Sequence, residues 1–307
     1  MTEFKGIQGF DISTSAYIFN PEKLFKLTDR LNQGKGESEW VGIELYPVQE
    51  RKVLGRFSLP PVSVDTVHQW QYKYNQTKVS RVHLEFAYDE HERKFMIEKG
   101  DFHRSRISPI QHKILYHYIR QATSGYGIDL ASALGVGANM HTNVALGLIK
   151  TGQLGTVRER VKDLIVENSI NYNSPVEQGP ILYDPEAIID GIVEKHGFKK
   201  FLLGVDHLID YFDKQGIDPM DVIKNEKVRH YTVALHIANP GHGPIKIGDP
   251  CYQKFFETVA GLQFEYPLRV VFDYSPVALL RYPLFLQQVR LFEKTIKWIQ
   301  GIKDSAR

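Results

Sequence analysis

The sequence predicts a single (β/α)8 barrel over residues 1–307, and three observations support this prediction. Short apolar runs rich in β-branched residues alternate with longer amphipathic segments, which is typical of consecutive βαβ units in a parallel sheet. We count eight such runs, as many as the strands of this barrel. Polar side chains recur at the carboxyl ends of the runs, where barrels of this kind build their active sites.

The predicted strands are, in order, residues 6–12, 40–46, 81–87, 138–141, 163–169, 201–206, 232–238 and 268–273. Helical patterns lie between them at residues 21–31, 110–122, 185–196, 219–223 and 252–260, and several begin with Pro at the first helical position. Residues 282–302 predict a long amphipathic helix that completes the outer ring. The segment 125–137 mixes glycines with a helical pattern and leaves the fourth strand short.

Composition indicates an ordinary soluble protein. Apolar residues make up 42% of the chain, enough for a full core without disulfides. The single cysteine excludes an intrachain disulfide, and the N-terminus lacks a secretory pattern, so a cytoplasmic location is expected. No apolar run approaches the roughly 20 residues that span a bilayer. The net charge of +2 predicts no basic surface for nucleic acid, which is therefore unsupported as a partner.

The polar residues at the strand ends suit a divalent metal. They are His83 and Glu85, His141, Glu167, Asp206, His207, His236 and Asp273. Because the carboxyl ends of barrel strands meet at one mouth, residues far apart in sequence become neighbours there. Carboxylates and imidazoles are the ligands that zinc, manganese and similar ions take. The pattern therefore predicts a metal site, and with it an enzyme.

Each candidate also has a structural interpretation. Glu167 follows a fully apolar run, and burying it without a cation is costly, which favours a ligand role. Asp206 is either a ligand or a helix N-cap, and Asp273 is either a ligand or the cap of a turn. A lone His236 would normally be a satisfied buried histidine. His83 and His141 are substrate contacts, further ligands or surface residues.

The loop NPGHGPIKIGDP holds His242, Lys246 and Asp249. Its Gly and Pro content fits either a shaped binding loop or simple turn chemistry. Its glycines match neither a phosphate-binding P-loop nor a dinucleotide fingerprint. The sequence also lacks a serine nucleophile elbow.

Five segments resemble the xylose-isomerase-like barrel superfamily, which includes sugar isomerases, ketose epimerases and endonuclease IV. These are GIELYP at 42–47, IVEN at 165–168, GVDH at 204–207, ALHIANPGHGPIKIGDP at 234–250 and VVFDYS at 270–275. The resemblance lies mainly in the second half of the chain. It implies one divalent ion, Mn²⁺, Mg²⁺, Co²⁺ or Zn²⁺, bound by Glu167, Asp206, His236 and Asp273. It also implies that Glu167 and Asp273 move a proton at the substrate carbon.

Two departures from the family pattern concern these residues. Asp273 stands where the epimerases have Glu, and its shorter reach favours a ligand role over a base role. His207 follows Asp206 directly, whereas the family histidine stands three residues beyond. We assign His83, His141, His207 and His242 to substrate binding.

The resemblance predicts a metal-dependent isomerase or epimerase acting on a sugar or related hydroxy-carbonyl small molecule, with a homo-oligomer as a possible assembly. One alternative is an endonuclease IV-like zinc phosphodiesterase on damaged DNA, in which His83, His141, His242 and Asp249 imitate part of its larger ligand set. The other is a non-catalytic barrel acting as a binding protein.

Overall fold

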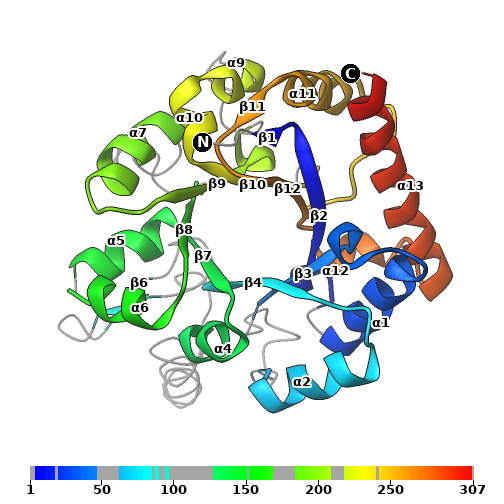
Figure 1. Cartoon of the computed structure of the whole chain (residues 1–307), viewed down its shortest axis with the longest axis horizontal. Coiled ribbons are helices and arrows are strands. Elements are labelled where there is room, and N and C mark those ends of the chain that lie inside the picture. Colours follow the sequence, from blue (N-terminus) through cyan, green and yellow to red (C-terminus); the bar gives the residue numbers. More distant parts are fainter. Residues whose placement is uncertain are drawn as a thin grey trace, which may run out of the picture. The chain divides into compact units, whose positions relative to one another are not determined.

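A closed barrel of eight parallel strands confirms the predicted (β/α)8 fold (Figure 1). The computed structural model describes residues 4–17, 20–46, 62–84, 87–89, 94–96, 127–150, 152–168, 184–208, 218–239 and 242–305. The strand order is β10-β12-β2-β3-β4-β7-β8-β9. These strands are β2 (Ile7–Ser13), β3 (Gly42–Leu45), β4 (Val79–Leu84), β7 (Gly137–His141), β8 (Leu164–Glu167), β9 (Lys200–Gly204), β10 (Thr232–Ile237) and β12 (Leu268–Phe272). Each overlaps one predicted strand.

The helices alternate with these strands along the chain. They are α1 (Pro21–Asn32), α2 (Val64–Lys73), α4 (Gly127–Leu134), α5 (Thr142–Lys150), α6 (Leu154–Arg160), α7 (Pro185–Ile188) with a π-helical continuation at Ile189–Glu194, α9 (Pro219–Lys224), α10 (Glu226–Tyr231), α11 (Pro250–Gly261), α12 (Pro276–Leu279) and α13 (Phe285–Ser305). Five predicted helices are confirmed as α1, α7 with its continuation, α9, α11 and α13. The predicted helix 110–122 lies outside the described residues. No described helix is both long and apolar enough to cross a bilayer.

The chain divides into two compact units. The first unit holds Met1–Glu44, Trp70–Lys78 and Phe201–Arg307, and the second holds Leu45–Gln69 and Val79–Lys200. The single domain expected over residues 1–307 stays a prediction.

In the first unit, β12 pairs in parallel with both β2 and β10. The long helix α13 packs against α1 and α11 outside these strands (Figure 1). Its Phe292 is fully buried and lies edge-on to Phe272 of β12, with ring centroids 5.6 Å apart. The two short strands β1 (Phe4–Lys5) and β11 (Gln263–Phe264) form an antiparallel pair. Lys303 near the end of α13 donates from Nζ to the Ile7 carbonyl at 2.6 Å.

A buried ion pair joins β2 to β12 in this unit. Arg269 donates from Nε and Nη2 to the two carboxylate oxygens of Asp11, at 2.8 Å each. The Asp11 side chain is fully buried, and that of Arg269 is 27% exposed. Gly9 leaves room for the guanidinium, because a Cβ at that position would clash with it.

In the second unit, β7 lies between β4 and β8 and pairs with both in parallel. The register sets His83 of β4 opposite Asn139 of β7, and His141 of β7 opposite Glu167 of β8. Side chains alternate between the two faces of a strand, so Asn139 and His141 share one face. The pairing therefore gathers polar side chains from three consecutive barrel strands.

Candidate functional site

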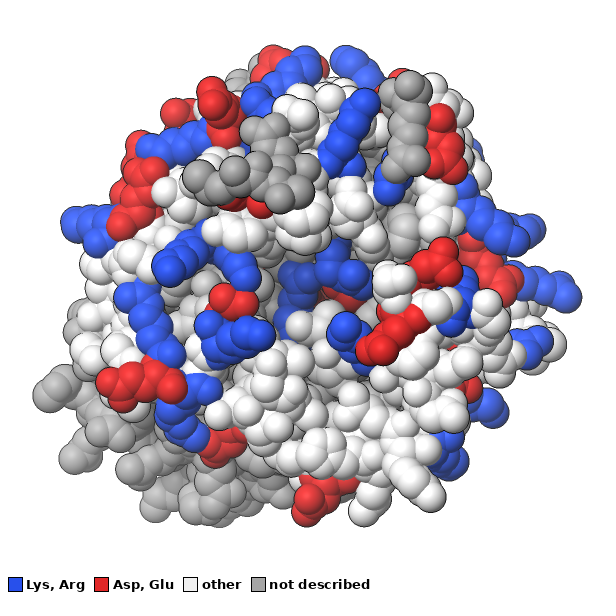
Figure 2. All heavy atoms as spheres, viewed as in Figure 1, with Lys and Arg blue, Asp and Glu red and all other residues white. Residues whose placement is uncertain are grey.

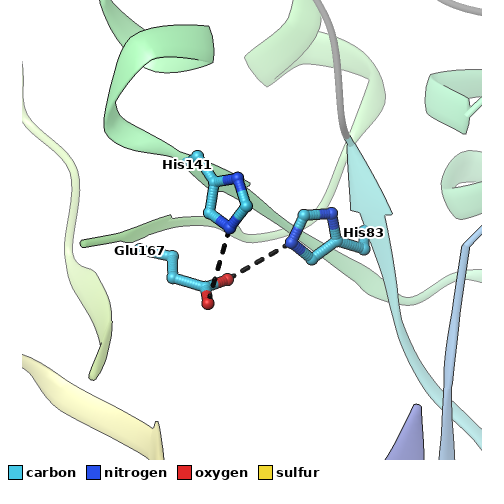
Figure 3. A group of neighbouring side chains, drawn as sticks. All are labelled: His83, His141 and Glu167. Carbon is cyan, nitrogen blue, oxygen red and sulfur yellow. Dashed lines mark hydrogen bonds and ion pairs between the residues drawn. The ribbon is translucent and has the colours of Figure 1, made fainter. Parts of the chain in front are cut away.

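Three candidate metal ligands lie together at the carboxyl ends of strands in the second unit. His83 is the penultimate residue of β4, and His141 and Glu167 end β7 and β8. One ligand atom from each lies within 4.8 Å of the others (Figure 3). We call these three residues the His–Glu cluster.

The Glu167 carboxylate contacts both imidazoles of the His–Glu cluster. Its Oε2 lies 3.3 Å from Nε2 of His83, and its Oε1 lies 3.7 Å from Nε2 of His141. The side chains of His83 and Glu167 are fully buried, and that of His141 is 19% exposed. A carboxylate at this depth is unfavourable unless positive charge compensates it. Two imidazoles and a carboxylate also match the ligand preference of zinc and similar ions.

Two neighbours hold the His–Glu cluster in place. Asn139 donates from Nδ2 to Oε2 of Glu167 at 3.2 Å. The ring of Tyr46 stacks on His83, with centroids 4.2 Å apart and planes 7° apart. We did not predict either contact from the sequence. The alternation of GANMH, in which Asn139 precedes His141 by two residues, is the signal that identifies Asn139.

A second group of ionisable residues lies in the first unit, and we call it the Asp–His cluster: Asp206, His207, His242 and Asp273. His242 Nδ1 lies 3.2 Å from Oδ2 of Asp273 and 3.6 Å from Oδ2 of Asp206. His207 Nδ1 lies 3.7 Å from the same Asp206 oxygen. The structure therefore brings two predicted ligands together with two histidines that we assigned to substrate binding.

Asp206 retains an unused acceptor in a buried position. It lies inside the helical turn of residues 205–208, past the position of an N-cap. Its residue exposure is 7%, and its Oδ1 has no hydrogen-bond partner within the described part of the chain. A buried carboxylate oxygen without a donor is costly, so this atom suits contact with a cation.

Asp273 follows β12 and is bound by groups distant in sequence. Ser15 donates from Oγ to Oδ1 of Asp273 at 2.5 Å, and Nδ1 of His242 lies 3.2 Å from Oδ2. Burial alone would raise the pKa of the Asp273 carboxyl, but the hydrogen bond and the charge of His242, together with the Ser15 hydrogen bond, lower that pKa well below its usual range. The group is therefore an anionic ligand candidate and a poor proton acceptor. Ser15 was not predicted.

His236 near the end of β10 has a specific buried partner. Its Nε2 lies 3.0 Å from Oε2 of Glu44 on β3, and both residues are almost fully inaccessible. We did not single out Glu44 from the sequence. Like Glu167, it sits in an apolar run, GIEL, where an acidic residue signals a required partner.

The loop after β10 fixes His242 by its backbone. His242 has φ 55°, in the left-handed region, where a non-glycine residue carries strain. Its carbonyl accepts from Ser275 N at 2.7 Å, and its neighbour Gly243 bridges to Asn239. Asp249 in the same loop is the N-cap of α11 and accepts from Cys251 N and Tyr252 N, which accounts for this residue by capping. Lys246 is exposed.

The candidate ligands inferred from the resemblance fall in both units: Asp206, His236 and Asp273 in the first, and Glu167 in the second. The four-residue ligand set and the catalytic and substrate-binding roles therefore stay predictions. Glu85 lies outside the described residues.

The fold and its polar residues define a class: (β/α)8 barrels with candidate metal ligands at or just beyond the carboxyl ends of their strands. No protein-family model matches the chain, and no curated protein matches it significantly. Among solved structures, the chain is similar to D-psicose 3-epimerase from Clostridium cellulolyticum H10, determined with D-tagatose. The TM-score is 0.54 at 12% identity, over 96% of this chain and 99% of the epimerase.

Two further structures are similar at lower TM-scores. An AP endonuclease of family 2 from Brucella melitensis gives 0.44 at 15% identity, over 90% of this chain and 98% of that one. A fusion of a xylose isomerase-like TIM barrel with a 4-hydroxyphenylpyruvate dioxygenase gives 0.43 at 12% identity, over 95% of this chain and 45% of that one. At these identities the likeness to the epimerase concerns the fold, and at that level it supports the resemblance found in the sequence.

Proposed function

We propose that this chain is a divalent-metal-dependent enzyme that isomerises or epimerises a sugar or a related hydroxy-carbonyl compound by proton transfer. The observation that carries the proposal is the His–Glu cluster, in which one carboxylate and two imidazoles approach within 4.8 Å of one another. The fold that the chain shares with D-psicose 3-epimerase supports the reaction class by analogy.

The residues present fit a divalent ion. In the second unit, Glu167 is buried against two imidazoles. In the first unit, taken by itself, Asp206 keeps a buried oxygen without a donor among the described residues. Borderline nitrogen and hard oxygen ligands together suit Zn²⁺ or Mn²⁺. We propose His83, His141 and Glu167 as ligands on this geometry. The ligand roles of Asp206, His236 and Asp273 are proposed on the sequence resemblance.

When bound, a divalent ion would polarise the carbonyl and hydroxyl oxygens of such a substrate. Of the two acidic residues proposed for proton transfer, Glu167 is the better candidate for the base that removes the proton from the substrate carbon. Asp273 is held ionised by Ser15 and His242, and a carboxylate with a lowered pKa is a weak base. We propose that His207 and His242 contact substrate hydroxyl groups.

The test is metal content followed by solvent exchange. The protein is purified without added metal and its metal is measured, for the wild type and for His83→Ala and His141→Ala. His68→Ala, on the exposed face of α2, is the matched control. We expect metal in the wild type and the control, and loss of metal in the two cluster variants. Incubation with a panel of aldoses and ketoses in D₂O should place deuterium next to the carbonyl. A metal-free wild type without exchange would refute the proposal.

A zinc phosphodiesterase acting on damaged DNA is the second candidate function. The observation behind it is that His83 and His141 lie together with Glu167, which gives more histidines near a carboxylate than the single-ion resemblance assigns as ligands. Charge argues against it, because Lys and Arg are interspersed with Asp and Glu over the described residues on the face in Figure 2, and the net charge is +2. Metal stoichiometry separates the candidates: one ion favours the isomerase, several zinc ions favour the phosphodiesterase, and none favours a binding protein.

A further inference from the structure

We propose that Glu44 is a positioning residue that fixes which ring nitrogen of His236 carries the proton. Glu44 accepts the Nε2 proton of His236, so the lone pair of the neutral ring is on Nδ1. The further step, that Nδ1 is the nitrogen that ligates the ion, rests on the proposed function.

The contact between the two residues is short and buried. Oε2 of Glu44 lies 3.0 Å from Nε2 of His236, and the exposed fractions of the two side chains are 0% and 2%. The two residues are 192 positions apart in the sequence, so their contact depends on tertiary structure. Strand pairing fixes both backbones, since Glu44 lies opposite Ser13 of β2 and His236 lies opposite Val271 of β12.

The chemistry of the pair sets the direction of the hydrogen bond. An ionised carboxylate is an acceptor only, whereas a neutral imidazole has one donor and one acceptor nitrogen. Facing the carboxylate with a lone pair would set two acceptors 3.0 Å apart in a buried position, so the proton belongs on Nε2. This bond also orients the ring and raises the basicity of the other nitrogen, as carboxylate partners of metal-bound histidines do.

A purely structural pair predicts different results from a positioning pair. If Glu44 only contributed to packing, its replacement would lower stability without changing which nitrogen of His236 is protonated. A positioning role predicts a change of tautomer in Glu44→Gln, because the amide can donate to Nε2 as well as accept from it. The tautomer is therefore the readout that distinguishes the two roles.

The first experiment uses metal-free protein labelled with ¹⁵N in its histidines. Two-bond ¹H–¹⁵N correlations identify the protonated ring nitrogen, and the His236 signals are assigned by their loss in His236→Asn. We expect the Nε2–H form in the wild type and a population of the Nδ1–H form in Glu44→Gln. Glu22→Gln, which removes a partly exposed carboxylate of α1 paired with Lys73, is the matched control and should leave His236 unchanged. A wild-type Nδ1–H form would overturn the inference without any variant.

The second experiment measures Zn²⁺ and Mn²⁺ affinity by competition with a chelator. Glu44→Gln should weaken binding by about 10–100-fold, the usual effect of losing such a partner, and Glu22→Gln should not. Thermal unfolding of each metal-free variant verifies that it is folded. Unchanged affinity and tautomer in Glu44→Gln would overturn the positioning role. A wild type that binds neither ion would instead overturn the proposed function, while the tautomer result would still decide the role of Glu44.

Discussion

Replacing Glu167 by Gln is the sharpest test of the His–Glu cluster. The substitution keeps the size of the side chain and removes the charge that lies 3.3 Å from His83 and 3.7 Å from His141. For an anionic ligand we expect metal affinity to fall by about 100-fold or more, which is roughly 2.7 kcal/mol at about 1.4 kcal/mol per factor of ten.

The effect can be measured as a loss of metal-dependent thermal stability. At a metal concentration of about 100 times the wild-type Kd, binding stabilises the folded state by about 2.7 kcal/mol, and after a 100-fold loss of affinity by about 0.4 kcal/mol. At about 2–4 °C per kcal/mol, the metal-induced rise in Tm should shrink by about 5–9 °C. The metal-free variant should unfold at or above the wild-type Tm, since a neutral amide is cheaper to bury than a carboxylate.

Glu186→Gln is the control for this experiment, because Glu186 is exposed on α7 of the same unit. Its metal-dependent rise in Tm should equal that of the wild type. If Glu167→Gln also kept the full rise, Glu167 would not be a ligand, and the interpretation of the cluster as a metal site would fail.

Three further predictions address other parts of the molecule. Asp273→Asn should lower metal affinity and deuterium exchange together, with excess metal restoring much of the rate; exchange that stays absent at full metal occupancy would show that Asp273 is the base. Asp11→Asn should lower the free energy of unfolding, measured with denaturant, by about 3 kcal/mol. This is at the lower end for a broken buried ion pair because Arg269 is 27% exposed, and a loss under about 1 kcal/mol would contradict the prediction. DNA with abasic sites should not be incised above the background of His83→Ala, because a net charge of +2 provides little electrostatic attraction for phosphates. Robust incision would favour the phosphodiesterase.

The barrel could be predicted from the sequence because parallel strands buried on both faces appear as apolar runs. The fifth run, predicted at 163–169, contains β8 (Leu164–Glu167), and the boundaries of most other strands differ by one or two residues. Helices without a strong amphipathic pattern were harder to recognise. Helix α4 (Gly127–Leu134) lies in the glycine-rich segment whose pattern was unclear.

The position of candidate ligands was easier to predict than their partners. Strand-end position alone placed His83, His141 and Glu167 at one edge of neighbouring strands, and the structure brings these three together. The contacts of Glu44 with His236 and of Ser15 with Asp273 depend on strand register and loop conformation. A two-residue alternation gives the face of a side chain and not its neighbour on another strand, so these partners required the structure.

The pairing of β2 with β12 has a consequence for folding during synthesis. The first barrel strand, β2, can pair fully with β12 only after residue 272 has been synthesised. At about 5–20 residues per second, the roughly 260 intervening residues take between about 13 and 50 s. Until then this edge of β2 lacks its partner strand, Leu268–Phe272, and the Asp11 carboxylate lacks its partner Arg269. An exposed strand edge is a site for wrong pairing, so the nascent chain is most open to aggregation or chaperone binding in this interval.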